Sequence, residues 1–371
     1  MSLRRAVEWV WYADGALPAV LRAALAPLSM VFGYVVSSRN SRLDRELATA
    51  ALPAMSIGNL TVGGTGKTPV SSWFAARMLA RGAKPAIVLR GYGDDEWRVH
   101  QLLTPAVGVT VNPDRRAAME RAKAQGADCA VLDDAFQHRR ARRVSDIVLV
   151  SVDRFQSPLR LLPAGPYREG WPALRRATAV VLTVKAAGDT DVERVARVVR
   201  EVAPSIPLAV VRLVPDRVCR VQPVAFAVDV AEQPSTAVFS SCAVTENGNE
   251  SHEVGWLRDR SVLLTSAIAD GDALERQVVS LGARLVRHLR FPDHYDFSAD
   301  DVTRVVRAAE GAEGVLCTLK DAVKLAPLWP RAAAPLWYLS QTLVVERGAE
   351  VLERECDRVL AARDATVPTV G

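Results

Sequence analysis

One glycine-rich segment restricts the fold of this chain more than any other feature. Residues 61–68 read Thr-Val-Gly-Gly-Thr-Gly-Lys-Thr, directly after the apolar run Ala54–Ile57 and before apolar residues at helical spacing. This is the context of a phosphate-binding loop, whose pattern is G-x-x-x-x-G-K-[ST] between a strand and a helix. Thr61 takes the position of the first glycine of the pattern. Other glycines still supply a flexible backbone: Gly58, Gly63, Gly64 and Gly66.

The loop pattern predicts a phosphotransferase that holds a nucleoside triphosphate. Backbone N–H groups and the start of the following helix point at the phosphates. We expect Lys67 to neutralise the β- and γ-phosphate oxygens and the Thr68 hydroxyl to reach Mg²⁺. The nucleotide-binding residues predicted in this way form the whole loop: Thr61, Val62, Gly63, Gly64, Thr65, Gly66, Lys67 and Thr68.

The rest of the chain alternates short apolar strands with amphipathic helices. A helix is predicted over 68–81, and apolar strands over 86–89 and 129–132. Such alternation indicates a parallel sheet with helices on both faces. The predicted fold is therefore α/β: a doubly wound, mostly parallel sheet of the P-loop NTPase type with a second, smaller α/β domain. The expected divisions are an apolar segment (1–40), a P-loop core (41–214), the smaller domain (215–345) and a C-terminal helix and tail (346–371).

The N-terminal segment is unusually apolar. Leu17 to Val36 is interrupted by Arg22 and two prolines, and its uncharged part, Ala23–Val36, has 14 residues. A helix needs about 20 residues to span a bilayer, so this run is expected to be too short. Two interpretations remain: a helix packed on the core, or a monotopic helix in a membrane interface. The net charge of +5 suits anionic partners without choosing among them.

Acidic residues follow two of the predicted strands. Asp133 and Asp134 end an apolar strand, where a P-loop enzyme places carboxylates for its metal ion. His138 and several arginines come shortly after them. Asp94, Asp95 and Glu96 follow Arg90-Gly-Tyr-Gly93 at the carboxyl end of another strand, the edge where α/β sheets bind ligands. One of these acids is a candidate base for an acceptor hydroxyl.

Three further motifs are weak when taken alone: Leu161–Glu169, Phe291–Ser298 and Thr318–Asp321. In this order and spacing, however, the motifs resemble the family of tetraacyldisaccharide 4′-kinases, the lipid A 4′-kinases of the Gram-negative envelope. The matching segments are Ser56–Pro69, Arg90–Tyr92, Leu132–His138, Leu161–Pro166 with Arg168-Glu169, Phe291–His294, and Lys320-Asp321.

The resemblance implies a reaction and a location. ATP would donate its γ-phosphoryl group to the 4′-hydroxyl of a tetraacyldisaccharide 1-phosphate, with Mg²⁺ as the metal ion. The enzyme would lie peripherally, as a monotopic protein, on the cytoplasmic face of the inner membrane, where its lipid substrate resides. The resemblance implies no nucleic acid partner, and no obligate protein partner is evident.

The resemblance also implies residue roles. Asp95 would be the base and would pair with His294, while Lys67 would serve catalysis at the phosphates. Thr68, Glu96, Asp133 and Asp134 would serve the metal ion, and Asn59, Tyr92, His138 and Arg168 would bind the substrate. Departures from the family pattern affect two of these roles. The insert before the catalytic acid is almost absent, so Asp94 is an alternative base, and Ala135 replaces a usual glycine.

Two rival interpretations share the phosphate loop. Membrane-associated ATPase switches of the ParA/MinD type carry a signature lysine at the position of Val62, so this chain departs from them. A P-loop ligase or kinase acting on a small soluble molecule would not need the apolar N-terminus.

Overall fold

The computed structural model describes residues 3–43, 50–91, 95–140, 142–221, 250–268, 270–293 and 295–365. The chain forms two compact units. The first contains residues 1–90, 107–213 and 343–371, and the second contains 91–106 and 214–342. The short piece 91–106 belongs to the second unit although both of its sequence neighbours belong to the first.

The first unit is built on a parallel sheet in the order β7-β6-β5-β1-β4-β2-β3. Its central strands are almost entirely buried, which explains their continuous apolar sequences. The strands are β1 (Ala54–Asn59), β2 (Pro85–Leu89), β3 (Gly108–Val111), β4 (Cys129–Asp133), β5 (Ser145–Ser151), β6 (Ala179–Val184) and β7 (Leu208–Arg220), the last of which continues into the second unit.

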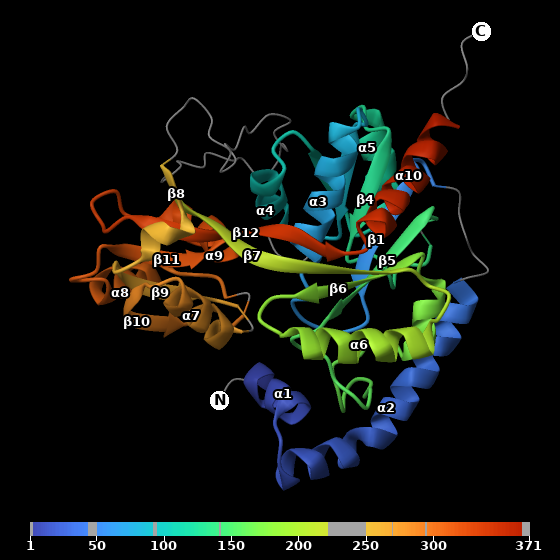
Figure 1. Cartoon of the computed structure of the whole chain (residues 1–371), viewed down its shortest axis with the longest axis horizontal. Coiled ribbons are helices and arrows are strands. Elements are labelled where there is room, and N and C mark those ends of the chain that lie inside the picture. The colour runs from blue at the N-terminus through green and yellow to red at the C-terminus, as the bar shows by residue number, and fades with distance from the viewer. Residues whose placement is uncertain are drawn as a thin grey trace. The chain divides into compact units, whose positions relative to one another are not determined.

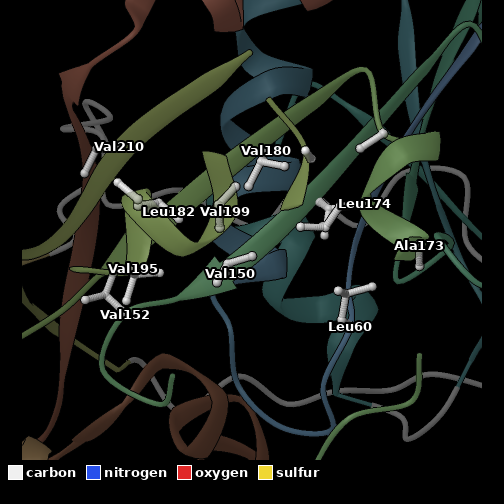
Figure 2. Close-up of a cluster of buried hydrophobic side chains, with 14 of the residues drawn as sticks. Leu60, Val150, Val152, Ala173, Leu174, Val180, Leu182, Val195, Val199 and Val210 are labelled. Atoms are coloured by element: carbon white, nitrogen blue, oxygen red, sulfur yellow. The ribbon is translucent and has the colours of Figure 1, made fainter. Parts of the chain in front are cut away.

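Helices cover both faces of this sheet, as the doubly wound prediction requires (Figure 1). One face carries α5, whose apolar side chains pack on β1, β2 and β4, and α6, which packs on β5 and β6. Figure 2 shows the second of these clusters, where Val195 and Val199 of α6 meet Val180 and Leu182. The helices of this unit are α3 (Lys67–Ala80), α5 (Arg115–Ala124), α6 (Asp189–Val202), α10 (Ala349–Asp364) and the short 3₁₀ helix η1 (Trp171–Arg176).

The apolar N-terminus folds into two helices, α1 (Leu3–Tyr12) and α2 (Ala16–Leu43). Arg22, which interrupts the apolar sequence, donates hydrogen bonds to the carbonyls of Val10 and Ala13, both at 2.9 Å. The charge therefore caps the end of α1 instead of ending α2. Helix α2 is 28 residues long, and by length and composition alone it is a candidate membrane span. The expectation that its uncharged run of 14 residues is too short to span a bilayer stays a prediction.

Helix α2 touches the body of the first unit at a few points. Ser29 donates to the carbonyl of Leu161 at 2.9 Å, and its hydroxyl accepts from the amide of Ala164 at 3.1 Å. Only four α2 residues are buried: Pro18, Ser29, Asn40 and Leu43. The large apolar side chains are mostly exposed, including Leu28, Val31 and Val35 at 55–61%. A helix packed on the core is excluded by this exposure.

The second unit has its own parallel strands in the order β10-β9-β11-β12, with β8 antiparallel to the end of β7. Apolar clusters lie on both faces: one contains α8 and α9 residues, the other contains α7 residues. Its elements are α4 (Glu96–Leu103), β8 (Ser251–Glu253), η2 (Val254–Leu257), β9 (Ser261–Ser266), α7 (Gly271–Ser280), β10 (Arg284–Arg290), α8 (Ala299–Ala308), β11 (Gly314–Thr318), α9 (Leu319–Leu325), η3 (Ala326–Leu328) and β12 (Leu336–Arg347), which continues into the first unit.

One glycine at the end of β1 is required by close packing. A β-carbon on Gly58 would lie 2.5 Å from Cβ of Phe136 and 2.8 Å from its backbone nitrogen. Phe136 is fully buried, so it has no room to withdraw. We expect Gly58→Ala to lower the free energy of unfolding by about 1–3 kcal/mol, because overpacking displaces a rigid core.

Urea unfolding monitored by tryptophan fluorescence measures this effect. Gly108→Ala is the matched control, because Gly108 also lies in a strand and nothing stands within 4 Å of its added β-carbon. Equal stability of the two variants would show that the turn after β4 adjusts to the extra carbon.

Candidate active site

The phosphate loop connects β1 to α3, as predicted. Gly63 and Gly66 have positive φ angles of 115° and 81°, which a residue with a β-carbon adopts only under strain. Gly66 immediately precedes Lys67, the first residue of α3. The start of α3 therefore has free backbone amides, and these are what an anion requires.

Side chains brace the loop from inside the sheet. Asn59 is fully buried and donates from Nδ2 to the Thr65 hydroxyl at 2.9 Å. Thr183, at the end of β6, donates to the carbonyl of Thr65 at 2.9 Å. The structure thus places Asn59 beneath the loop, where it supports the nucleotide cradle, and its predicted contact with the substrate stays a prediction.

The segment Leu161–Glu169 lies directly against the phosphate loop. The amide of Val62 donates to the carbonyl of Pro166 at 2.8 Å, and the amide of Arg168 donates to the carbonyl of Leu60 at 2.6 Å. These backbone contacts bring a motif that is weak in sequence to the centre of the candidate site.

Asp134 connects three parts of this site. Its carboxylate lies 3.8 Å from Nζ of Lys67 and 3.3 Å from Nη1 of Arg168. Asp134 also has a positive φ of 48°, a conformation that aspartate tolerates better than most residues. Ala135, which replaces a usual glycine of the family, has no positive φ, so the glycine is not needed there.

The predicted metal ligands divide between the units. Thr68, Asp133 and Asp134 belong to the first unit and Glu96 to the second. No group of three or more His, Cys, Asp or Glu residues with metal-binding geometry occurs among the described residues. This sparse donor set still fits Mg²⁺, which usually takes one or two carboxylates and completes its shell with water and phosphate oxygens.

His138 lies in a strongly cationic environment. Burial lowers its pKa to about 4, and Arg115 and Arg143 add to the effect. The imidazole is therefore neutral at pH 7, and it is able to exchange hydrogen bonds but not to supply a charge. Arg143 is engaged with Asp146 at 2.8 Å and with the carbonyl of His138 at 2.6 Å, so it holds this turn together.

A buried ionic cluster lies beside Arg168. Glu169 is 5% exposed, and one of its oxygens accepts from Arg176 at 3.0 Å and from Asn40 of α2 at 3.1 Å. Arg139 lies 3.6 Å from the same carboxylate. Sequence reasoning noted the Arg168–Glu169 pair but not these partners, because Asn40 is 129 positions away from Glu169.

Asp95, the predicted base, belongs to the second unit and precedes α4. It is 4% exposed, and its carboxylate lies 3.6 Å from Nζ of Lys324. The same ammonium group donates to the carbonyl of Tyr295 and to Asp296, both at 3.2 Å. Lys324 thus holds Asp95 next to the segment in which His294 stands in the sequence.

Lys324 was missed by sequence reasoning. Its only signal in the sequence is its position three residues after Asp321, on a short helix where its side chain is 14% exposed. Asp321 is buried, and burial raises its pKa to about 6. It accepts from the amide of Ala267 at 3.1 Å and from Thr318 at 2.6 Å, which fixes the start of α9. Tyr92, Asp94 and His294 lie outside the described residues.

The sheet order, the glycine loop and the acidic strand end together define a P-loop protein that transfers phosphoryl groups. Comparison with known proteins then gives the particular family. Residues 21–360 match the LpxK family, described as tetraacyldisaccharide-1-P 4′-kinase, and the chain belongs to that family. It is thus a kinase of lipid A biosynthesis.

Individual relatives cover nearly the whole chain. The tetraacyldisaccharide 4′-kinase of Anaeromyxobacter sp. (strain Fw109-5) is 33% identical, over 98% of this chain and 99% of the relative. That of Bdellovibrio bacteriovorus is 29% identical, over 86% and 94%. Among solved structures, LpxK from Aquifex aeolicus in complex with ATP is similar at 25% identity, with a TM-score of 0.67, covering 91% of this chain and 99% of that one.

The ion pair between Asp95 and Lys324 generates a prediction. Lys324→Met leaves a buried carboxylate without its cation and releases the 295–296 segment. We expect kcat to fall about 10- to 100-fold, because misplacing a catalytic group by an ångström has effects of this size. The KM for nucleotide is expected to change less than about threefold, since no nucleotide-binding residue is altered.

Steady-state kinetics separate the two constants, and Asp296→Asn is the control. The side chain of Asp296 is 95% exposed and forms a second ion pair with Lys324. Removing the charge of Asp296 leaves the ion pair between Lys324 and Asp95 in place. A fall in kcat that is equal in both variants would refute the role given to the Asp95 pair.

Proposed function

We propose that this chain transfers the γ-phosphoryl group of ATP to the 4′-hydroxyl of tetraacyldisaccharide 1-phosphate, at the cytoplasmic face of the inner membrane. The observation that carries the proposal is the position of Lys67, at the start of α3 and 3.8 Å from the carboxylate of Asp134. Family membership supports the acceptor, and the ATP complex of the Aquifex relative supports the donor.

The phosphate loop binds the triphosphate. Backbone amides of the loop, other than those of Val62 and Thr65, which donate to the carbonyls of Pro166 and Gly63, surround the β- and γ-phosphates. Lys67 neutralises the charge that moves toward the leaving oxygen. Asp134 holds Lys67 until the nucleotide enters. Thr68 and carboxylates among Asp133, Asp134 and Glu96 would hold Mg²⁺, which would supply positive charge beside the phosphates.

The acceptor hydroxyl loses its proton to a carboxylate of the second unit. Asp95 takes this proton as the 4′-oxygen forms its bond to the γ-phosphorus, while the bond from that phosphorus to the β-phosphate oxygen breaks and ADP leaves. The family resemblance supports His294 as the partner of Asp95, and Asp94 is the alternative base if the match to the family pattern is shifted by one residue. Lys324 keeps the Asp95 carboxylate in place.

The anionic groups of the substrates bind to residues that follow β4 and to residues of the 161–169 segment. Arg168 suits a phosphate because its planar guanidinium offers two parallel donors. His138 contributes a neutral hydrogen-bonding group, since burial lowers its pKa to about 4. Tyr92 and Asn59 complete the proposed set.

Helix α2 provides the membrane contact. Leu28, Val31 and Val35 follow one another at spacings of three and four, so they lie on one face of the helix, and all three are exposed. Such a face enters the interface between headgroups and acyl chains. The lipid substrate remains in the bilayer, so the enzyme meets it at the surface.

The lipid kinase reaction is directly testable. Purified protein with ATP, Mg²⁺ and detergent-dispersed tetraacyldisaccharide 1-phosphate is expected to give the bisphosphate, detected by mass spectrometry as the gain of one phosphate. We expect Lys67→Ala to lower the rate at least about 100-fold, as the loss of one transition-state donor does. Lys123→Ala, at an exposed site on α5, is the control and should retain the wild-type rate. Absence of the bisphosphate with the wild-type protein would disprove the proposed function.

Membrane attachment is tested by replacing Leu28, Val31 and Val35 together with glutamine. We expect vesicle binding to weaken at least about tenfold, because each apolar side chain gains roughly 1.5–3 kcal/mol when it leaves water. Flotation with vesicles of phosphatidylethanolamine and phosphatidylglycerol measures this.

The matched control for this experiment replaces three exposed valines elsewhere, Val279, Val286 and Val344, with glutamine. If both triple variants bind vesicles as the wild type does, α2 is not the membrane contact.

A further inference from the structure

Arg154 follows β5 at the same sheet edge as the phosphate loop. Strands β1 and β5 are parallel neighbours, with Asn59 in register with Leu149. The carboxyl ends of neighbouring parallel strands meet at one edge, where α/β proteins bind their ligands. Arg154 was not among the residues that the sequence marked, because it belongs to no nucleotide-binding pattern.

The guanidinium of Arg154 lies beside the phosphate loop. A β-carbon on Gly63 would lie 3.1 Å from its Nη1 atom. Gly63 is the third residue of the loop and has a φ of 115°, so its backbone turns sharply where the loop curves around the phosphates. A β-carbon at this position would be strained by the positive φ and would also push the guanidinium away by a few tenths of an ångström.

On its other side the guanidinium lies over an aromatic ring. Its central carbon is 5.1 Å from the ring centroid of Tyr12, the last residue of α1. This separation is within the range of cation–π attraction. Burial raises the pKa of the Tyr12 hydroxyl, so the ring remains a neutral phenol.

Arg154 keeps its charge available, because the carboxylate next to it in sequence is occupied. The two oxygens of Asp153 accept from the amides of Lys185, Ala186 and Ala187 at 2.7–2.8 Å. Across the described part of the chain, Arg154 makes no ion pair, whereas Lys67 and Arg168 share Asp134. Arg154 is therefore a half-buried cation beside the loop with no anion of its own.

We propose that Arg154 is a further catalytic residue, which contacts the γ-phosphoryl group of ATP, and that Tyr12 is a positioning residue for it. This inference rests on the proposed function. A guanidinium at this place stabilises the charge on the transferring group, as an arginine supplied by the same chain does in other P-loop enzymes. Because Tyr12 ends the first apolar helix, the N-terminal segment acts on phosphoryl transfer as well as on membrane contact.

The test compares nucleotides that do and do not carry a γ-phosphate. Calorimetry is expected to show that Arg154→Ala binds a non-hydrolysable ATP analogue about tenfold more weakly, with ADP affinity within twofold of wild type. In the lipid kinase assay its kcat is expected to fall about 100- to 1,000-fold. Unchanged kcat, or an equal loss of affinity for the analogue and ADP, would overturn the role. ADP binding also confirms that the variant is folded.

Two further comparisons assign the positioning role. Tyr12→Phe keeps the ring and is expected to retain the wild-type kcat, whereas Tyr12→Leu is expected to lower kcat about tenfold with unchanged ADP affinity. Equal activity of these two variants would overturn the role of Tyr12. Arg194→Ala is the matched control, because Arg194 also lies over a nearby ring, that of Phe155 at 5.6 Å, and pairs with Asp191 on the surface.

This design separates the inference from the function on which it rests. If the wild-type protein does not phosphorylate the lipid, the proposed function fails, while the difference between analogue and ADP still tests the contact of Arg154 with the γ-phosphate.

Discussion

The carboxylate of Asp134 is the contact on which the candidate site depends. It lies between two cations, Lys67 of the phosphate loop and Arg168 of the segment after β5. Each cation is about a third exposed or less, so the pairs are screened less than pairs at an open surface. Three segments that are far apart in the sequence are thereby held at one sheet edge. In the proposed reaction, a phosphate of the nucleotide replaces the Asp134 carboxylate as the anion next to Lys67.

A second, more deeply buried cluster of charged residues lies next to these ion pairs. Glu169 carries one negative charge among Arg139, Arg176 and the amide of Asn40. Removing a single partner from such a cluster leaves an uncompensated buried charge, which is costly. Because Asn40 belongs to α2, the end of this helix is hydrogen-bonded to the residue next to Arg168. The end of α2 and the segment that lies against the phosphate loop are therefore linked within the first unit.

Much of this fold was predictable because its signals are local. The phosphate loop, the strand before it and α3 each show their own residue pattern, and the family resemblance joined the weaker motifs. Three features were not predictable. The hydrogen bonds of Arg22 to the carbonyls of Val10 and Ala13 are one, because a hydropathy count treats this arginine only as an interruption. Strands β7 and β12 extend far beyond their apolar starts, because pairing continues through partly exposed sequence. The partners of Asp95 and Gly63, Lys324 and Arg154, come from distant segments and belong to no motif.

The piece of chain 91–106 has a consequence for how the protein is divided. It carries Asp95 and α4, belongs to the second unit, and stands between strands β2 and β3 of the first. The chain therefore passes from one unit to the other four times, near residues 90, 106, 213 and 342. Neither unit is a continuous stretch of sequence. A single cut between residues 106 and 214 therefore separates the proposed base, Asp95, from the rest of the second unit. The two units are thus interleaved in one polypeptide, and neither can be excised from it as a single segment.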